Sequence, residues 1–419
     1  MTSGVAAPAL PFDPAEEMAG PGFRADPYPF YAVMRERAPV HRVRGAWLIS
    51  RCADVEAALA DPRMSSDRDR MTAALGSGSP VVRELSRLTA RLGRVMSNTD
   101  APEHSRLRRL VSRGFTARRV ERLRGDVQRV VDGLLDGAGS ELDVVGDLAM
   151  PLASAVICEL FAVPEADRPR VHGWFAVLRD LLADVARSEQ VVGEFHEYLS
   201  WLAARRREQP GQDVVSALVA AQAEDDRLTE EELLSTCYVI ITAGDETTTH
   251  LIGNGVLALL RHPEQLALLR ARPDLVGRAV DECARYDSPT QVITRVLAAD
   301  LELGGQLLRE GDIAYLGLAS ANRDPRRHAD PDLFDLARSG RGSLAFGHGP
   351  HFCLGASLAR LEVELAIGSL VRASPGLRLR GDGLEWHRNP LQRKLIALPV
   401  VRWDAPLSSP SRGTPCPVS

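Results

Sequence analysis

The sequence predicts a mainly helical protein with a few small β-sheets, built as one large domain. Helical periodicity runs through most of the 419 residues, and strand-like segments are few and short. Length alone would permit two or three domains. However, no Pro/Gly/Ser-rich linker, repeat or low-complexity break divides the chain, so we expect one domain.

The helical segments carry apolar residues at the spacing of amphipathic or buried helices. In chain order they are Ala53–Ala60, Glu103–Gly114, Ala117–Leu135, Leu148–Phe161, Val171–Leu182, Val191–Arg207, Glu230–His262, Val276–Tyr286 and Gly355–Arg372. The strand-like segments are Val40–Val43, Ala46–Ile49, Leu301–Leu303, Ile313–Leu318, Leu377–Leu379 and Leu395–Val401.

The two ends differ in composition from the rest of the chain. Residues 1–20 are rich in Ala, Pro and Gly, and residues 404–419 read DAPLSSPSRGTPCPVS. Such compositions rarely support a packed core. We therefore expect a flexible N-terminal segment, a folded domain over residues 21–403 and a disordered tail.

Charge and cysteine usage exclude several classes of protein. The net charge of −5 argues against nucleic acid as a partner, and Lys394 is the single lysine among 51 Lys and Arg residues. The six cysteines show no disulfide spacing, no signal peptide opens the chain, and no apolar stretch approaches the length of a membrane span. These features favour a cytoplasmic protein without a membrane partner.

The segment Phe346–Gly355, FGHGPHFCLG, holds one cysteine among glycines, histidines and phenylalanines. A helical run follows, so Cys353 is expected at a loop-to-helix junction. Free N–H groups and the helix dipole stabilise a thiolate there, and the thiolate is the form that binds a metal. Gly347 permits a tight turn and the approach of a flat partner, and Phe346 would keep water from the sulfur.

The residues alone leave other interpretations of this cysteine open. A lone cysteine is most often a small buried apolar side chain. The spacing of His348, His351 and Cys353 could also be part of a zinc site. Zinc sites need three or four ligands, and no nearby Cys pair or acidic ligand completes this one.

FGHGPHFCLG closely resembles the haem-binding signature of the cytochromes P450, the haem-thiolate monooxygenases. The resemblance runs from about Trp47 to Val400. It implies the cytochrome P450 fold, with haem b (iron-protoporphyrin IX) between the long central helix and the cysteine loop. It also implies that Cys353 is the axial ligand of the iron, and that the chain is of the soluble bacterial kind.

A long helix is predicted over Glu230–His262. Thr229 and Glu232 form a capping box at its start, and Pro263 closes its end. At 1.5 Å per residue it would be about 50 Å long. Its centre, Ala243–Thr249, contains a glycine, two acids and three threonines, which are poor helix formers. Such a departure indicates either a kink with satisfied hydroxyls or a functional segment.

The same segment, AGDETT, resembles the oxygen-activating helix of the cytochromes P450. The resemblance implies that Ala243 and Gly244 lie over the haem. It implies that Glu246 and Thr247 form an acid–alcohol pair, which passes protons through water to bound dioxygen. Asp245 occupies a position that varies in the family, so we expect no catalytic role for it.

Glu282 and Arg285 are spaced to pair on one helix face, where the plainest interpretation is an exposed ion pair worth about 0–1 kcal/mol. The segment AVDECARYDSP resembles the buried Glu-x-x-Arg helix of the family, in which a further arginine locks the pair. Arg323 is our candidate for that arginine. The trio is expected to be structural and to hold the loop that presents Cys353.

Buried haem carboxylates need cationic partners. His104 and Arg108 are spaced to share one helix face, Arg295 follows an extended segment after Pro289, and His351 precedes the cysteine by two residues. Each alone would more often be an ordinary surface charge. The resemblance places all four at the positions that bind the haem propionates.

The resemblance also implies a mainly apolar substrate pocket oriented by a few polar groups. The expected lining residues come from the central helix, the segment after Pro289 and the last strand turn, with a lid over Trp174–Val185 and Val191–Trp201. They are Ile240, Gln291, Val292, Thr294, Leu395 and Ile396. Neither the residues nor the resemblance names the substrate.

Three functions are compatible with these motifs. The first is a monooxygenase that hydroxylates or epoxidises a small hydrophobic metabolite with O2, with electrons passed from NAD(P)H through ferredoxin reductase and ferredoxin. The second is a haem-thiolate oxidase that couples two radicals without inserting oxygen. The third is a haem sensor or electron carrier, which would have no use for Glu246 and Thr247 as a proton relay. We expect a monomer in each case.

Overall fold

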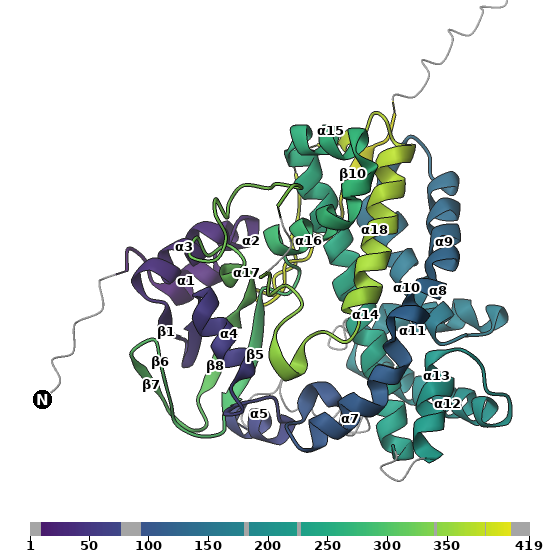
Figure 1. Cartoon of the computed structure of the whole chain (residues 1–419), viewed down its shortest axis with the longest axis horizontal. Helices are drawn as coiled ribbons and strands as arrows, with labels where there is room; N and C mark the ends of the chain where they lie inside the picture. Colours follow the sequence, from purple (N-terminus) through teal and green to yellow (C-terminus); the bar gives the residue numbers. More distant parts are fainter. Residues whose placement is uncertain are drawn as a thin grey trace, which may run out of the picture.

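The computed structural model describes residues 10–76, 94–179, 184–223, 228–338, 342–381 and 383–403. Helices dominate these ranges, and the longest described one, α14 (Glu230–Arg261), spans 32 residues and crosses the middle of the molecule (Figure 1). The prediction of a mainly helical single domain with small sheets is confirmed. The predicted tail, residues 404–419, lies outside the described residues.

Helix α14 begins as the capping box predicts. The Thr229 hydroxyl accepts a hydrogen bond from the Glu232 N–H at 3.1 Å, and the Glu232 carboxylate accepts one from the Thr229 N–H at 2.9 Å. The helix assignment is unbroken through its unusual centre, where the Thr247 and Thr249 hydroxyls donate to carbonyls one turn earlier, each at 2.7 Å. These hydroxyls are thus satisfied within the helix itself.

The helix-rich part of the molecule packs around α14, which contacts α10, α12, α13, α15, α16 and α18. Most of the large apolar core lies among these helices. Their bounds are α7 Glu103–Val111, α8 Ala117–Arg122, α9 Arg124–Gly137, α10 Met150–Leu160, α11 Arg168–Leu178, α12 Val185–Glu208, α13 Val214–Ala220, α15 Pro263–Ala271, α16 Val276–Tyr286 and α18 Ala356–Ala373.

Periodicity alone misplaced several helix boundaries. The predicted helix over 117–135 is broken at Leu123 into α8 and α9. The predicted helix over 148–161 starts with a wider π-helical segment, Val144–Ala149, before α10. Helices α13 and α15 were not predicted, because each is short and its apolar pattern spans only about two turns.

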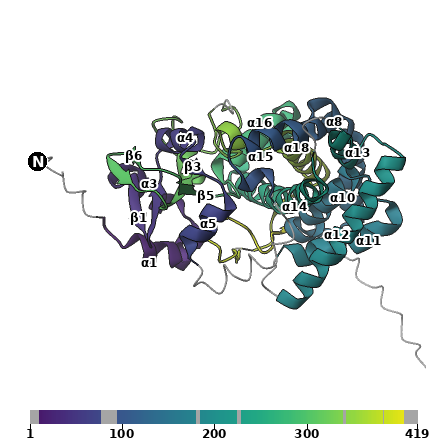
Figure 2. The ribbon, with the colours of Figure 1, turned by 90° about the horizontal axis from the view of Figure 1, so that it is seen from below.

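The sheet-rich part lies beside the helices along the long axis (Figures 1 and 2). Its five-stranded sheet has the order β1-β2-β8-β5-β3, in which β8 runs parallel to β2 and the other pairs are antiparallel. Helices α1 to α5 and α17 flank it. The bounds are β1 Val40–Val43, β2 Ala46–Ile49, β3 Met64–Ser65, β5 Val292–Leu297, β8 Ile313–Gly317, α1 Pro14–Ala19, α2 Pro21–Ala25, α3 Tyr28–Arg37, α4 Cys52–Ala60, α5 Arg68–Leu75 and α17 Leu318–Ala321.

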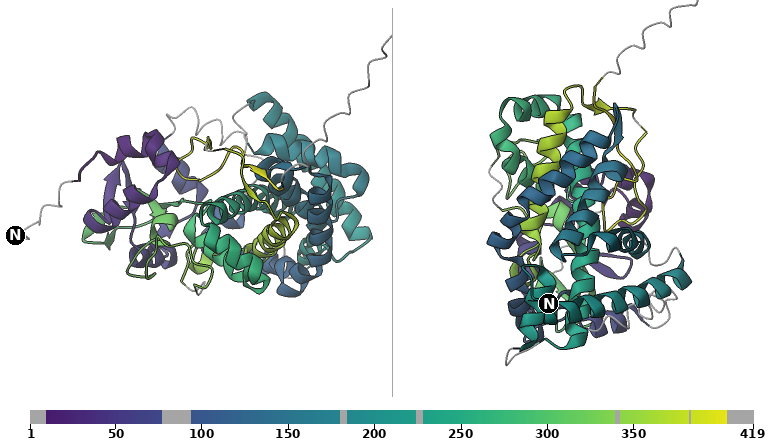
Figure 3. Two further views of the ribbon diagram at one scale, coloured as in Figure 1. Left: turned by 90° about the horizontal axis from the view of Figure 1, so that it is seen from above. Right: turned by 90° about the vertical axis from the view of Figure 1, so that its right-hand side faces the viewer.

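Two smaller sheets complete the described structure. Strand β10 (Pro399–Val401) lies between β4 (Glu141–Asp143) and β9 (Arg378–Leu379), and β6 (Leu301–Leu303) pairs with β7 (Gln306–Leu308). The chain after α18, yellow in Figure 3, crosses from the helix-rich part to the N-terminal helices and returns. Arg393 marks this crossing, because its guanidinium donates to the Arg24 and Ala25 carbonyls of α2.

The N-terminal prediction needs a correction within residues 10–20. The segment contains α1, whose first turn is capped by the Asp13 carboxylate, and Pro14 starts the helix. Phe12 stacks on Phe30 of α3 at a ring-centroid distance of 5.4 Å. Capping and this aromatic contact order a segment whose composition indicated flexibility. Among the described helices, none is long and apolar enough to span a membrane.

Candidate active site

The loop that carries Cys353 is fixed by hydrogen bonds within its own backbone. The Cys353 N–H donates to the Phe346 carbonyl at 2.8 Å, and the Gly347 N–H donates to the Leu344 carbonyl at 2.8 Å. Helix α18 starts at Ala356, three residues after the cysteine. The loop-to-helix junction predicted from the sequence is therefore present, and the ring of Phe346 lies under the guanidinium of Arg360 at 4.4 Å.

Two glycines of this loop have conformations or neighbours that exclude other residues. Gly347 and Gly349 have φ values of +76° and +69°. A Cβ atom at Gly349 would lie 2.9 Å from the Leu59 carbonyl oxygen of α4, which is closer than such atoms approach. The loop is thus pressed against the backbone of α4.

Cys353 is the accessible cysteine of the described chain, whereas Cys52, Cys158, Cys237 and Cys283 are buried. The surrounding protein raises the pKa of the Cys353 thiol by desolvation, and a hydrogen bond from Gly355 with the charge of Arg108 opposes that rise. A further positive charge at the sulfur would stabilise the thiolate. This environment fits an iron ligand better than a structural thiol.

The four predicted propionate ligands surround one region. The rings of His104 and His351 lie 4.0 Å apart, and burial lowers the pKa of both imidazoles, to about 4 for His351. Burial likewise lowers the pKa of Arg108, and it lowers that of Arg295 to about 10. Arg108 and Arg295 are therefore cations in a poorly hydrated place, and the two imidazoles beside them are neutral hydrogen-bonding groups. We call these four residues the cation cluster, after its two arginines.

This cation cluster is not neutralised by the described part of the chain. Neither Arg108 nor Arg295 forms an ion pair with a described carboxylate, and Nε2 of the buried His104 has no hydrogen-bond partner. Asp100 lies close but is bound by the Ser65 hydroxyl and the Ser66 N–H. The donor set therefore fits a ligand with two carboxylates, as haem has.

The centre of α14 presents an open face. Ala243 is exposed and Gly244 and Thr247 are half-buried, although most residues of the following two turns are buried. The predicted placement of a planar group over this face is compatible with these exposures. A Cβ atom at Gly244 would meet only the Ile157 side chain, at 3.7 Å, so this glycine is not required by a close backbone contact.

Glu246 and Asp245 are neighbours in the chain but pair in different directions. Glu246 forms an ion pair with Lys394, a residue that the sequence analysis did not connect with the site. Asp245 is buried and binds the Arg179 guanidinium at 2.5 and 3.0 Å and the Ser154 hydroxyl at 2.8 Å. Asp245 therefore ties α14 to α10 and to the end of α11, as a structural residue would.

The Glu282–Arg285 pair is buried as the resemblance implied, but the third residue is not Arg323. Arg338 approaches the Glu282 carboxylate at 3.3 Å. Arg323 instead donates to the Tyr286 carbonyl and to Asp332, and its guanidinium stacks on the Tyr286 ring at 3.6 Å. The Arg323 side chain reaches Tyr286, at the end of α16, rather than the Glu282 carboxylate.

The buried pair is connected to the cysteine loop. Arg285 donates to the Asn322 carbonyl at 3.0 Å, and the Asn322 side-chain oxygen accepts the Leu344 N–H at 2.6 Å. The Leu344 carbonyl in turn accepts the hydrogen bond from the Gly347 N–H of the cysteine loop. The expected structural role of the pair agrees with this continuous path.

The predicted pocket residues separate into buried and open positions. Leu395 is fully buried in the core beside Gly253, so we correct its assignment to the pocket wall, whereas the adjacent Ile396 is 49% exposed. Gln291 is buried, with its amide nitrogen donating to the Ser288 carbonyl. The remaining three are buried or half-buried: Ile240 in α14, and Val292 and Thr294 in β5.

Other possible sites are separate from this region. The described residues contain no group of three or more His, Cys, Asp or Glu side chains able to hold a metal, so the alternative of a zinc site has no support among them.

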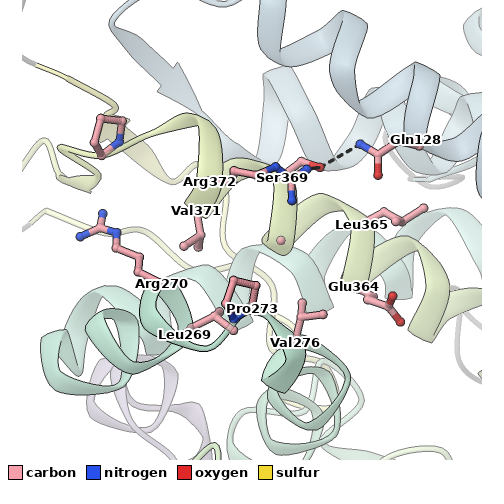
Figure 4. A pocket seen from close by; sticks show the side chains of 12 residues that line it. Gln128, Leu269, Arg270, Pro273, Val276, Glu364, Leu365, Ser369, Val371 and Arg372 are labelled. Carbon is pink, nitrogen blue, oxygen red and sulfur yellow. Dashed lines mark hydrogen bonds between the residues drawn. The ribbon is translucent and has the colours of Figure 1, made fainter.

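A groove between α9, α15 and α18 is lined by Gln128, Arg270, Glu364 and Arg372 among others (Figure 4). Arg270 and Arg372 are held there by Ser374 and Ser369.

Comparison with known proteins agrees with this geometry. The family described as cytochrome P450 matches residues 139–373. Cytochrome P450 107B1 of Saccharopolyspora erythraea is 42% identical over 96% of this chain and 99% of its own, and the cytochrome P450 monooxygenase PikC of Streptomyces venezuelae is 43% identical over 92% of each chain. The crystal structure of CalO2 superimposes with a TM-score of 0.84 at 37% identity, covering 94% of this chain and 98% of its own. The chain belongs to the cytochrome P450 family and is a haem-dependent monooxygenase.

Proposed function

We propose that this monooxygenase hydroxylates or epoxidises a small, mainly hydrophobic metabolite of secondary metabolism. The observation that carries this proposal is the open face of α14, on which Ala243 and Thr247 lie one turn apart with Glu246 between them. A haem sensor or electron carrier would not need an acid and an alcohol at this face. Relatives named as hydroxylases support the same reaction class.

The residues of the cation cluster would hold the haem. Cys353 would supply the thiolate ligand, and Arg108, Arg295, His104 and His351 would bind the two propionates. When bound, the haem supplies the reductive activation of dioxygen. Two electrons and two protons enter in each turnover, one oxygen atom joins the substrate and the other leaves as water.

Thr247 and Glu246 would deliver the protons. The Thr247 hydroxyl now donates to the Ala243 carbonyl, so its oxygen remains able to accept a hydrogen bond from water. Glu246 is the neighbouring acid and can exchange protons with solvent. In this arrangement Thr247 holds the water that gives up a proton, and Glu246 replaces that proton.

The substrate class is proposed from the relatives and from the composition of the pocket. 6-Deoxyerythronolide B hydroxylase of Saccharopolyspora erythraea is 38% identical over 92% of this chain, and vitamin D(3) 25-hydroxylase of Pseudonocardia autotrophica is 40% identical over 90%. These relatives are named as hydroxylases of 6-deoxyerythronolide B and of vitamin D(3), and we propose a hydrophobic small molecule as the substrate of this chain as well. Ile240 and Ile396 offer apolar surface of the kind that such a molecule needs.

Electrons are proposed to come from a ferredoxin. Arg109 and Arg113 lie near the C-terminal end of α7, the helix that also carries His104 and Arg108. The Arg109 and Arg113 side chains are exposed, and Arg106 of the same helix pairs with Glu103 and Glu232. A basic face at this position favours an acidic electron donor despite the negative net charge of the whole chain.

The test begins with the visible spectrum of the reduced carbon-monoxide complex, which should be of the thiolate type. Spectral shifts on adding 6-deoxyerythronolide B, vitamin D3 or myristic acid would then identify a ligand class. Turnover with that ligand under isotopically labelled dioxygen should give a product carrying one labelled oxygen atom. A coupled product without labelled oxygen would instead establish the oxidative-coupling function.

A further inference from the structure

One face of α14 carries three polar residues that all contact the same segment. Glu246, His250 and Asn254 follow one another at intervals of four residues, so they lie in a row along the helix. The segment they face is the C-terminal hairpin (residues 385–396), which is closed by the His387 N–H donating to the Lys394 carbonyl at 2.9 Å.

Each member of the row has its own partner in the C-terminal hairpin. Glu246 pairs with Lys394. The ring of His250 lies 6.2 Å from the ring of His387. The Asn254 amide nitrogen donates to the Arg393 carbonyl at 3.1 Å. A row of polar residues that is buried at His250 and Asn254 and matched along its length by one segment is not explained by packing alone.

This interface contains buried polar atoms that have no protein partner. They are Nδ1 of His250, Oδ1 of Asn254 and Oε1 of Gln291, whose residues are 6%, 1% and 2% exposed. The Gln291 N–H donates to the Leu391 carbonyl at 3.0 Å, so this residue also lies against the hairpin. Buried polar groups are normally satisfied, and ordered water is the usual partner where protein supplies none.

The interface also opens to the surface. A cleft is lined by Gln291, His387 and Lys394, together with residues of α2. His387 is exposed, whereas the Lys394 side chain is 12% exposed and reaches inward to Glu246. Lys394 is the single lysine of the chain. Its ammonium group is more compact than a guanidinium and sits on a flexible stem.

We propose that the row Glu246–His250–Asn254 and the C-terminal hairpin enclose a line of water that carries protons from the cleft at His387 to Glu246. In this path Lys394 is a positioning residue, whose ion pair holds the Glu246 carboxylate toward the water. The inference rests on the proposed role of Glu246 as the acid that serves Thr247.

The proton balance of the path is simple. Glu246 gives one proton to the water held by Thr247 and takes one from the line of water, whose far end takes one from solvent at the cleft. Burial, followed by the charge of Lys394, lowers the pKa of His250 to about 3, so His250 remains neutral. A neutral imidazole has one N–H donor and one acceptor nitrogen, which is what a member of a water chain needs.

Two measurements test the path in the haem-loaded enzyme. A high-resolution crystal structure should show water within hydrogen-bond distance of the three unpartnered atoms. Oxygen consumption should then be followed with NADPH, ferredoxin reductase and a [2Fe–2S] ferredoxin, with myristic acid as the probe, in H2O and in D2O. Lys394→Met and His250→Leu should each slow oxygen consumption about tenfold, as expected for the loss of one hydrogen bond, and should change the solvent isotope effect.

Conservative variants separate this role from a structural one. Lys394→Arg and His250→Asn keep a cation and a water-binding group, so both should retain most of the rate. Arg388→Ala removes an exposed charge from the same hairpin and should change nothing. Carbon-monoxide spectra establish that each variant is folded and loaded.

The outcomes distinguish the inference from the function on which it rests. A dry interface, or wild-type rates and isotope effects in both Lys394→Met and His250→Leu, would overturn the path if Glu246→Ala still slows oxygen consumption. If Glu246→Ala and Thr247→Ala also behave as wild type, the proposed relay itself is wrong. If Lys394→Met or His250→Leu does not load haem, the test uses Lys394→Arg or His250→Asn and the crystal structure instead. A dry interface together with an unchanged isotope effect would then overturn the path.

Discussion

Arg285 donates two hydrogen bonds to Glu282, from Nε and Nη2, each at 2.7 Å, and both side chains are 2% exposed. The remaining guanidinium nitrogen binds the Asn322 and Pro331 carbonyls. The pair therefore joins α16 to the segment that leads to the cysteine loop. Because the pair is buried, each charge is stabilised by the other rather than by water.

Replacing either partner should prevent haem incorporation rather than only slow turnover. Glu282→Ala leaves the buried Arg285 without a carboxylate, and Arg285→Ala leaves the buried Glu282 with only the longer contact to Arg338. Breaking a buried ion pair costs about 3–5 kcal/mol. Haem content and urea unfolding measure the effect. Arg272→Ala is the control, because Arg272 and Asp274 form an exposed pair whose loss should change neither haem content nor unfolding noticeably. A fully loaded but slow Glu282→Ala enzyme would contradict the structural role.

Cys353→His should abolish the thiolate-type spectrum of the reduced carbon-monoxide complex. The imidazole can bind iron, but it does not donate charge as a thiolate does. Cys158→Ala, which removes a buried thiol, should leave the spectrum unchanged. Survival of the spectrum in Cys353→His would show that another residue is the ligand.

Thr247→Ala should keep haem and ligand binding but lose product and release hydrogen peroxide. Reduction continues in this variant, while the proton needed to cleave the O–O bond is no longer delivered in time. General acid steps contribute about 10²–10⁴-fold, so the loss of product should be large. Thr249→Ala is a matched control, because its hydroxyl makes the same bond to a carbonyl one turn earlier yet is buried. Normal coupling of electrons to product in Thr247→Ala would favour the oxidative-coupling function.

Glu362→Gln should stabilise the protein at neutral pH. Burial raises the pKa of the Glu362 carboxyl well above its ordinary value of 4.5, and Oε2 of this residue has no partner. The folded state then keeps a proton that the unfolded state releases, so the free energy of unfolding falls as pH rises above 4.5, by up to about 1.4 kcal/mol per pH unit.

Urea unfolding between about pH 5 and pH 8 measures this slope. The slope should be shallower in Glu362→Gln than in the wild type, because the amide does not titrate. Glu364→Gln provides the control on the same helix, since Glu364 is partly exposed and paired with Arg124 at 2.9 Å. Equal slopes in the wild type and Glu362→Gln would mean that another group sets the pH dependence.

Reversing Arg109 and Arg113 to Glu should slow reduction by an acidic ferredoxin. The defect should shrink at high salt, where the attraction lost in the variant is screened in the wild type as well. Stopped-flow reduction across salt concentrations measures it. Arg129→Glu changes an exposed charge on α9 and should have little effect. Reduction kinetics that do not depend on salt in any variant would remove the basic face as the docking surface.

Local patterns in the sequence predicted many of the elements. Helix α16 and strands β1, β2 and β6 have the predicted bounds, because each has a strong pattern closed by turn residues. Strand β5 was missed, since its residues alternate weakly and it is held by β8 and β3, which are distant in sequence. Pairing between distant segments leaves no local signal.

The same limit explains the errors in the site. The residues of the cation cluster follow motifs and are brought together as predicted. Arg338, Lys394 and Arg179 were not assigned, because each meets its carboxylate from a segment whose position depends on the whole fold. Lys394 is notable in the sequence as the single lysine, but the sequence does not show with which acid it forms an ion pair.

Asp245 and Glu246 give one turn of α14 two attachments, to Arg179 at the end of α11 and to Lys394 in the C-terminal hairpin. Moving the end of α11 away from α14 would strand the buried Asp245 charge, at a cost of about 3–5 kcal/mol. Asp245 therefore fixes this end of α11 to the turn of α14 that carries Glu246 and Thr247. We expect the binding of a substrate to leave that contact in place, so that Glu246 and Thr247 keep their positions.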